Sequence, residues 1–178
     1  MTDGNFIETP RLILRRLCEA DYEHLIRLNQ DKDVMEFFPS ILTEAQTLTQ
    51  IERINNHFSE YGYGLFAVER NDNGDFIGFT GLTHPTFESS FTPCVEIGWR
   101  LSKANWGMGF ATEAAKACLE HGFKVIGLKE IYSFTAVLNT RSEQVMKKIG
   151  MIKQGEFDHP RMEDGHILRR HVLYKICN

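Results

Sequence analysis

The chain has 178 residues, a formal net charge of −4, 42% hydrophobic residues and 25% charged residues. This length suits one domain with its own core, and we expect a single domain over residues 1–178. The slightly acidic balance offers no basic surface for nucleic acid, and no apolar run approaches the ~20 residues that cross a bilayer. The composition therefore predicts a globular protein with neither a nucleic-acid nor a membrane partner.

The cysteines indicate reduced thiols rather than disulfides or a metal site. They show no CxxC spacing, and none of the seven histidines pairs with a cysteine at ligand spacing. The N-terminal sequence MTDGNFIETP lacks the basic and apolar regions of a secretory signal. We expect a cytoplasmic protein that holds no metal. The cysteines are Cys18, Cys94, Cys118 and Cys177.

The first part of the chain is predicted to form a strand and two helices. Residues 11–17 (RLILRRL) are rich in branched side chains and indicate a strand, and a helix follows over residues 19–29. From Thr43 to Tyr61 apolar residues recur every three or four positions, which is typical of an amphipathic helix. Thr43 and Gln46 form a capping box at its start. The apolar stripe comprises Leu48, Ile51, Ile54 and Phe58.

Three strands are predicted next. Residues 64–70 (GLFAVER) and 76–82 (FIGFTGL) are strand-like, and residues 71–75 (NDNGD) between them indicate a hairpin turn. In residues 94–101 (CVEIGWRL) apolar and other residues alternate, which predicts a strand with one apolar face.

The remaining elements alternate between helix and strand. We expect a helix over residues 110–125, a strand over 130–137, a helix over 140–149, and strands near 152–157 and 167–176. The order is β-α-α-β-β-β-α-β-α-β-β. It predicts an α/β (α+β) fold with a central mixed, mostly antiparallel sheet and helices on both faces.

A glycine-rich turn precedes the helix at residues 110–125. In residues 105–116 (NWGMGFATEAAK), Gly107 and Gly109 stand just before the helix, whose first N–H groups have no intrahelical partner. Such a turn can cradle an anion. No P-loop lysine is present, and Thr112 occupies the third glycine position of a dinucleotide fingerprint, so both nucleotide patterns fail. A plain helix entry remains the alternative.

These residues carry a family resemblance. Residues 106–111 (WGMGFA) resemble the [Q/R]-x-x-G-x-[G/A] acyl-CoA loop of the GNAT superfamily of N-acetyltransferases, and LSKANWGMGFATEA is similar to the WGxGYATEA version of the RimJ/RimL type. ETPRLILRRL resembles that type's first strand, EIGWRL its fourth strand, and NTRSEQVMKKIGM its NxxSxxVxxKxGF segment. The resemblance covers roughly residues 8–176. It implies transfer of an acetyl group from acetyl-CoA to an amine.

The family's fold implies the cofactor contacts. Its fourth and fifth strands separate, and acyl-CoA lies in the resulting V, with the glycine loop on the pyrophosphate and pantetheine along the fourth strand. The family also uses Asn139, an expected helix N-cap, to hold pantetheine. The residues expected to bind acetyl-CoA are Trp99, Leu101, Trp106, Gly107, Met108, Gly109, Phe110, Ala111, Thr112, Asn139 and Ser142.

Acetyl transfer to an amine requires a base, because amines are mostly protonated at pH 7. Glu96 is the candidate, as a carboxylate on an apolar strand beside the expected thioester site. The alternatives are a solvated strand glutamate or an ion-pair partner of Arg100.

The leaving thiolate is helped by an acid. The family's tyrosine position corresponds here to Met146, so the resemblance offers Ser142 instead, one turn earlier, and Ser142 could equally serve helix capping. Trp106 replaces the usual Gln or Arg of the loop. We expect this change to be tolerated, because the loop binds through backbone N–H groups.

The acceptor amine stays open. His159 lies where the family's substrate-facing loop would be, although a lone histidine is often structural. A protein N-terminus or a small-molecule amine would fit, in a monomer or a homodimer, with direct attack in a ternary complex. The alternatives are a catalytically silent acyl-CoA-binding module and a nucleotide-binding domain.

Overall fold

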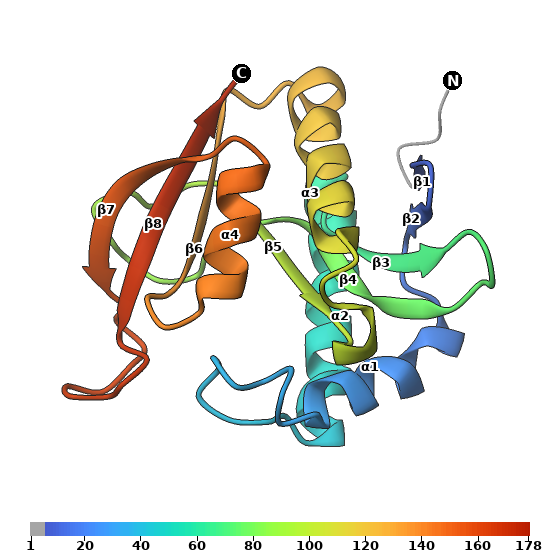
Figure 1. Ribbon diagram of the computed structural model, residues 1–178, viewed down its shortest axis with the longest axis horizontal. Coiled ribbons are helices and arrows are strands. Elements are labelled where there is room, and N and C mark those ends of the chain that lie inside the picture. The colour runs from blue at the N-terminus through green and yellow to red at the C-terminus, as the bar shows by residue number, and fades with distance from the viewer. Residues whose placement is uncertain (1–5) are drawn as a thin grey trace.

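The computed structural model describes residues 6–178, which form one eight-stranded sheet flanked by helices (Figure 1). The helices are α1 (Tyr22–Gln30), α2 (Glu44–Tyr61), α3 (Phe110–His121) and α4 (Thr140–Lys148). The strands are β1 (Phe6–Glu8), β2 (Leu12–Arg15), β3 (Leu65–Arg70), β4 (Phe76–Thr83), β5 (Glu96–Leu101), β6 (Glu130–Ala136), β7 (Ile152–Asp158) and β8 (Arg170–Cys177).

The strands follow the order β1-β2-β3-β4-β5-β6-β8-β7, and every neighbouring pair but one is antiparallel. β5 and β6 run parallel, and within the described residues they pair only at Glu96 and Tyr132. Beyond that pair the two strands separate, as Figure 1 shows. The predicted mixed, mostly antiparallel sheet is confirmed, and it is open between β5 and β6.

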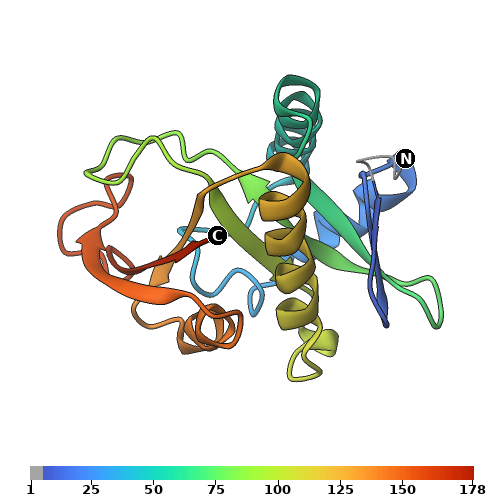
Figure 2. The same ribbon diagram turned by 90° about the horizontal axis from the view of Figure 1, so that it is seen from above.

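The helices cover both faces of the sheet, as predicted. α1 and α2 lie on one face, and α3 and α4 lie on the other (Figure 1 and Figure 2). α3 packs on β4 and β5 through Ala114, Ala115 and Cys118, which are at most 1% exposed. These small side chains let the helix approach the sheet closely, so its N-terminus lies near the end of β5.

The predicted order of elements is confirmed, with one strand added at the start. β1 has only three residues and pairs with β2 at the sheet edge, and so short a strand shows no sequence period. The capping box of α2 forms as predicted: Gln46 N donates to Thr43 Oγ1, and Thr43 N donates to Gln46 Oε1.

The apolar stripe of α2 was wrong at Leu48. This residue is 39% exposed, whereas Thr47 is fully buried. Thr47 Oγ1 accepts a hydrogen bond from Asn29 Nδ2 of α1 at 3.1 Å, so a polar contact between the helices fixes which side of α2 faces inward.

Two element boundaries also differ from prediction. The helix expected over residues 110–125 ends at His121, and Gly122–Ile126 forms a π-helical turn. A Cβ atom on Gly122 would lie 2.9 Å from Leu82 Cδ1, so the chain packs directly on the sheet there. The last strand begins at Arg170 rather than Ile167, because Ile167 lies in the preceding turn and is 73% exposed.

Residues 6–178 contain neither a membrane-spanning helix nor a metal-binding group. None of the helices there is long and apolar enough to span a membrane. No group of three or more His, Cys, Asp and Glu side chains in this part of the chain is arranged to hold a metal ion.

Candidate active site

The turn into α3 is built on two glycines in the left-handed region. Gly107 has φ +74°, and Gly109, the N-cap of α3, has φ +82°. Residues with a Cβ atom rarely adopt these angles, so the backbone itself requires glycine. The N–H groups of Phe110, Ala111 and Thr112 have no partner within the helix and lie at the positive end of its dipole. The turn therefore presents donors suited to an anion.

Thr9 and Arg11, in the turn between β1 and β2, hold this glycine turn in place. Glu113 Oε1 accepts hydrogen bonds from Thr9 Oγ1 at 2.7 Å and Arg11 N at 3.0 Å, and Arg11 Nε donates to Glu113 Oε2 at 2.6 Å. Arg11 Nη1 donates to the Met108 carbonyl at 2.9 Å. Burial alone would raise the pKa of Glu113. The hydrogen bonds from Thr9 and Arg11 have the larger combined effect, so the pKa of Glu113 lies below its usual value. The ionised carboxylate and Arg11 thus fix the orientation of the turn.

The side chains of the turn differ in exposure. Met108 is 51% exposed, while Phe110 is 5% exposed and packs into the core beneath the Arg11 guanidinium, 4.6 Å from its ring centroid. Ala111 and Thr112 are partly exposed. A ligand at the turn would consequently meet backbone amides more than large side chains.

β5 directs alternate main-chain groups toward the opening between β5 and β6. Val95 O and Ile97 O accept hydrogen bonds from β6 residues at 2.8 and 2.9 Å. The period of two places the main-chain groups of Trp99 on the same edge, beyond the last pair with β6. Leu101 O is engaged, because it accepts the indole N–H of Trp106 at 2.8 Å. The main chain of Trp99 is thus free for the expected contact with pantetheine. Leu101 can offer only its N–H group on this edge, because its carbonyl is already bonded to Trp106.

Arg141, in the first turn of α4, links three parts of this opening. Its Nη2 pairs with Glu36 Oε2 at 2.6 Å, and its guanidinium lies 4.5 Å from the centroid of the Trp106 ring system and 5.5 Å from that of Phe37. Glu36 and Phe37 belong to the segment between α1 and α2. Arg141 was missed in the sequence, because none of its three partners is near it along the chain.

The start of α4 is capped by Asn139, as predicted. Asn139 Oδ1 accepts a hydrogen bond from Ser142 N at 3.1 Å, and Nδ2 donates to Thr135 Oγ1 at 3.0 Å, which leaves one amide hydrogen of the side chain unused. The Ser142 hydroxyl makes no hydrogen bond within residues 6–178 and is partly exposed. Met146 is 1% exposed and belongs to the core.

Glu96 begins β5 where that strand pairs with β6. Its side chain points to the face that α1 and α2 cover, opposite to the fully buried Ile97. Its carboxyl group has no hydrogen bond or ion pair among the described residues, and burial raises its pKa to about 8. A carboxyl group that titrates near this pH and has no partner can take a proton from a bound amine.

Arg100 is not the partner of Glu96. Its Nη1 donates to Asn29 Oδ1 at 2.5 Å, and its guanidinium lies 4.1 Å from the ring centroid of Phe38 and 5.2 Å from that of Phe79. Its Nε is buried without a partner among the described residues. The ion-pair alternative for Glu96 is therefore wrong.

His159 lies within a group of aromatic rings. Its ring centroid is 4.6 Å from that of Phe87 and 4.9 Å from that of His171, and its Nδ1 accepts a hydrogen bond from Arg161 N at 3.2 Å. Burial, with the nearby His171 and Arg161, lowers the pKa of His159 to about 4. His171 is 7% exposed, and its Nδ1 lies 3.0 Å from Arg169 O.

Cys94, which is half-buried, and Cys118, which is buried, are unsuited to nucleophilic attack. Burial, together with the charges of Glu96 and Glu130, raises the pKa of Cys94 to about 11, and burial raises that of Cys118 to about 12. Both stay protonated thiols, and the thiolate is the nucleophilic form.

Known proteins match this chain over most of its length. Residues 11–152 match the family described as an acetyltransferase (GNAT) domain. The Uncharacterized N-acetyltransferase YnaD of Bacillus subtilis is 32% identical over 153 residues, which cover 85% of each chain.

Solved structures show the same fold. A GNAT-family acetyltransferase from Bacillus anthracis superposes with a TM-score of 0.80 at 29% identity, covering 97% of this chain and 98% of its own. The spermidine N-acetyltransferase of Vibrio cholerae, solved with CoA and spermine, superposes with a TM-score of 0.75 at 21% identity and covers 95% of this chain and 96% of its own.

Proposed function

The chain belongs to the GNAT acetyltransferase family and is an acetyl-CoA-dependent acyltransferase, and we propose that it acetylates a primary amine by direct attack in a ternary complex. The observation that carries the proposal is the left-handed glycine turn at the start of α3, beside the opening between β5 and β6. At this place the backbone N–H groups of the turn can donate to a pyrophosphate, and the free edge of β5 can pair with pantetheine.

In this proposal the chain holds acetyl-CoA along the opening. The backbone N–H groups between Gly107 and Thr112 donate to the pyrophosphate, and Trp99 pairs its main chain with pantetheine as an added strand would. Arg141 exchanges Glu36 for a phosphate oxygen, since its guanidinium already lies over Trp106. Acetyl-CoA supplies the acetyl thioester.

Glu96 and the acceptor carry out the proton transfer. The amine nitrogen, as a free base, forms a bond to the acetyl carbonyl carbon while the carbon–sulfur bond breaks. Glu96 takes one proton from the nitrogen, directly or through water, and the sulfur leaves as a thiolate. That proton then returns from Glu96 through water to the sulfur, which ends as a thiol, and Glu96 is again ionised. The amine and acetyl-CoA are thus converted to an N-acetyl amide and free CoA, with atoms and charge in balance.

Ser142 is proposed to donate a hydrogen bond to the leaving sulfur, because its hydroxyl is unbonded while Asn139 already provides the helix cap. We expect Ser142→Ala to lower kcat about tenfold, at the lower end of general-acid effects, and to leave the KM for acetyl-CoA within about twofold. Steady-state kinetics check this. Unaltered turnover would reduce Ser142 to a structural residue of the helix start.

Acetyl-CoA is expected to stabilise the protein against heat. At 100 times its Kd a ligand adds about 2.7 kcal/mol, which corresponds to a rise in Tm of about 5–10 °C for a chain of this size. ATP and NAD should give no comparable rise, since the turn lacks both nucleotide patterns. The measurement is a thermal unfolding curve with each ligand.

Two further results would decide between the proposal and its alternatives. Arg141→Ala should need about tenfold more acetyl-CoA for the same rise in Tm, whereas Lys124→Ala, in the π-helical turn that follows α3, should not. Stabilisation by ATP alone would contradict an acyl-CoA site. Binding of acetyl-CoA without turnover of any amine would indicate the silent module.

The motifs support a RimJ/RimL-like member as the finer assignment within the family. A cytoplasmic location is also part of the proposal, because all four cysteines are free thiols. His159 is proposed to contact the acceptor as a neutral ring.

A further inference from the structure

A cluster of aromatic rings lies across the opening from β5, on the sheet face that Glu96 shares. Ring centroids are 5.5 Å apart for Phe87 and Phe134, 4.9 Å for Phe91 and Phe157, and 5.6 Å for Phe134 and Phe157. All its members remain partly exposed, so the cluster is a surface rather than a closed core. We call it the aromatic wall, and it consists of Phe87, Phe91, Tyr132, Phe134, Phe157 and His159.

The wall is assembled from three separate parts of the chain. Tyr132 and Phe134 lie on β6, Phe157 lies on β7, and Phe87 and Phe91 come from the segment between β4 and β5. That segment runs behind β7 and β8 in Figure 1 and reaches the connection between β7 and β8 in Figure 2. A hydrogen bond joins the β7–β8 connection to the segment between β4 and β5: Arg161 Nη2 donates to Thr86 O at 2.8 Å.

Open space lies over Gly98, on the face of β5 that carries Glu96. Glu96 pairs with Tyr132 and the strands are parallel, so Gly98 is level with Phe134 across the opening. A Cβ atom added to Gly98 would meet no atom within 4 Å. The missing side chain therefore leaves room beside the proposed base, bounded on the far side by the wall.

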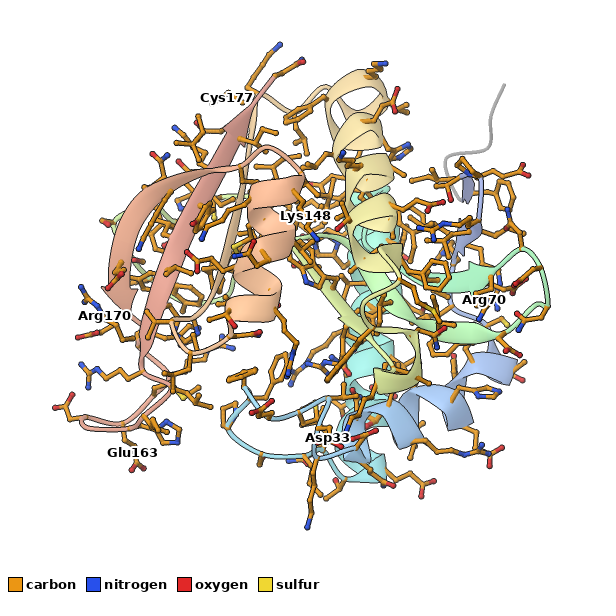
Figure 3. All side chains as sticks on the ribbon, viewed as in Figure 1. Asp33, Arg70, Lys148, Glu163, Arg170 and Cys177 are labelled. Carbon is orange, nitrogen blue, oxygen red and sulfur yellow. The ribbon has the colours of Figure 1, made fainter. Side chains whose placement is uncertain are left out.

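The charges around this space disfavour a polycation. Arg100 lies on the same face four residues after Glu96 and has no carboxylate partner among the described residues. Glu88 and Glu163 have no cation partner in the described part of the chain and are exposed, and Glu163 lies at the outer end of the β7–β8 connection in Figure 3. Four carboxylates on the elements around this space pair with cations: Glu36 with Arg141, Asp33 with Lys103, Glu130 with Lys175, and Asp158 with Arg170.

We propose that the acceptor is a primary amine with a single charge and an aromatic ring, whose ring packs on the aromatic wall while its nitrogen lies over Gly98 beside Glu96. The inference rests on the proposed acetyl transfer and names its acceptor class. Aromatic rings gain from burial and from edge-to-face contacts with other rings. A polyamine would bring extra positive charges toward Arg100, which has no carboxylate partner of its own among residues 6–178.

The test compares primary amines by the release of CoA thiol. With 2-phenylethylamine we expect a kcat/KM at least tenfold above those of hexylamine and spermidine at equal pH. Equal or better turnover of spermidine or hexylamine would overturn the inference and leave acetyl transfer intact. If acetyl-CoA binds and no amine is acetylated, the proposed function fails, and the inference fails with it.

Three variants test the geometry. Gly98→Val fills the space beside Glu96 and should lower kcat/KM for 2-phenylethylamine at least tenfold, with an unchanged rise in Tm on acetyl-CoA binding. Phe134→Leu should lower kcat/KM for this amine about tenfold and reduce its preference over hexylamine. Phe6→Leu, the same exchange at the exposed far edge of the sheet, should change neither. Unaltered kinetics in both Gly98→Val and Phe134→Leu would overturn the inference.

Discussion

Glu96→Gln is expected to lower kcat about 100-fold and to leave acetyl-CoA binding nearly unchanged, because the amide cannot accept the amine's proton. Glu96 must be ionised to act, and its pKa is raised to about 8. In the wild-type protein kcat/KM should therefore rise steeply with pH up to about pH 8 and less steeply above it. Glu96→Gln should lose the pH dependence that comes from Glu96. The pH dependence that comes from deprotonation of the amine, near pH ~10 for an alkylamine, should persist in the wild type and in the variant.

The control for this result is Glu120→Gln, a carboxylate exposed on α3 and paired with Lys124, which should stay within about twofold of wild type. A pH–rate profile of Glu96→Gln that matches the wild type would remove Glu96 as the base. The activity measurements are initial rates over pH 6–10 at saturating and limiting amine.

The same carboxyl group should also affect stability. Its pKa is 4.5 in the unfolded chain and about 8 in the folded protein, so between these values the folded state holds a proton that the unfolded state has lost. Stability from this group is full below pH 4.5 and is lost as pH rises toward 8. The Tm of Glu96→Gln relative to wild type should accordingly increase across that window.

Gly81→Ala is expected to destabilise the fold by about 3 kcal/mol, through a backbone collision and a strained φ. Gly81 has φ +154°, and its added Cβ would lie 2.0 Å from Gly64 O and 2.8 Å from Leu65 Cα. β3 and β4 cannot move apart there without losing the bond from Leu82 N to Gly64 O. The expected fall in Tm is about 6–12 °C in a thermal unfolding experiment.

Gly98→Ala is the matched control, because Gly98 pairs with Gly81 on the neighbouring strand. Its added Cβ meets nothing within 4 Å, so the unfolding free energy should stay within about 0.5 kcal/mol of wild type. Equal Tm values for the two variants would contradict the contact at Gly81.

The sequence predicted the main elements because their signals are local. The capping box of α2, the alternation in β5 and the glycines before α3 each depend on residues a few positions apart, and each was confirmed. The resemblance added the family, which the comparisons confirmed. Leu48 was misplaced because a single helix does not reveal which side its neighbour will contact.

The site was less predictable wherever it depends on partners far apart in the chain. Arg11 holds Glu113, Arg141 holds Glu36, and Arg100 turns to Asn29 rather than to the nearer Glu96. The indole N–H of Trp106 donates a hydrogen bond to the Leu101 carbonyl, and the alternating pattern of the strand does not predict this bond. Each of these contacts depends on packing between elements, and no local period records it.

By itself the sequence determined the helix and strand types, the need for glycine before α3 and the presence of a carboxylate at position 96. Only the tertiary structure decided that this carboxylate has no partner within residues 6–178 and that Gly98 faces open space near an aromatic wall. The physical reason is that hydrogen bonding within an element is local, whereas burial, the pKa of a carboxyl group and the room beside it are set by whatever the fold brings alongside.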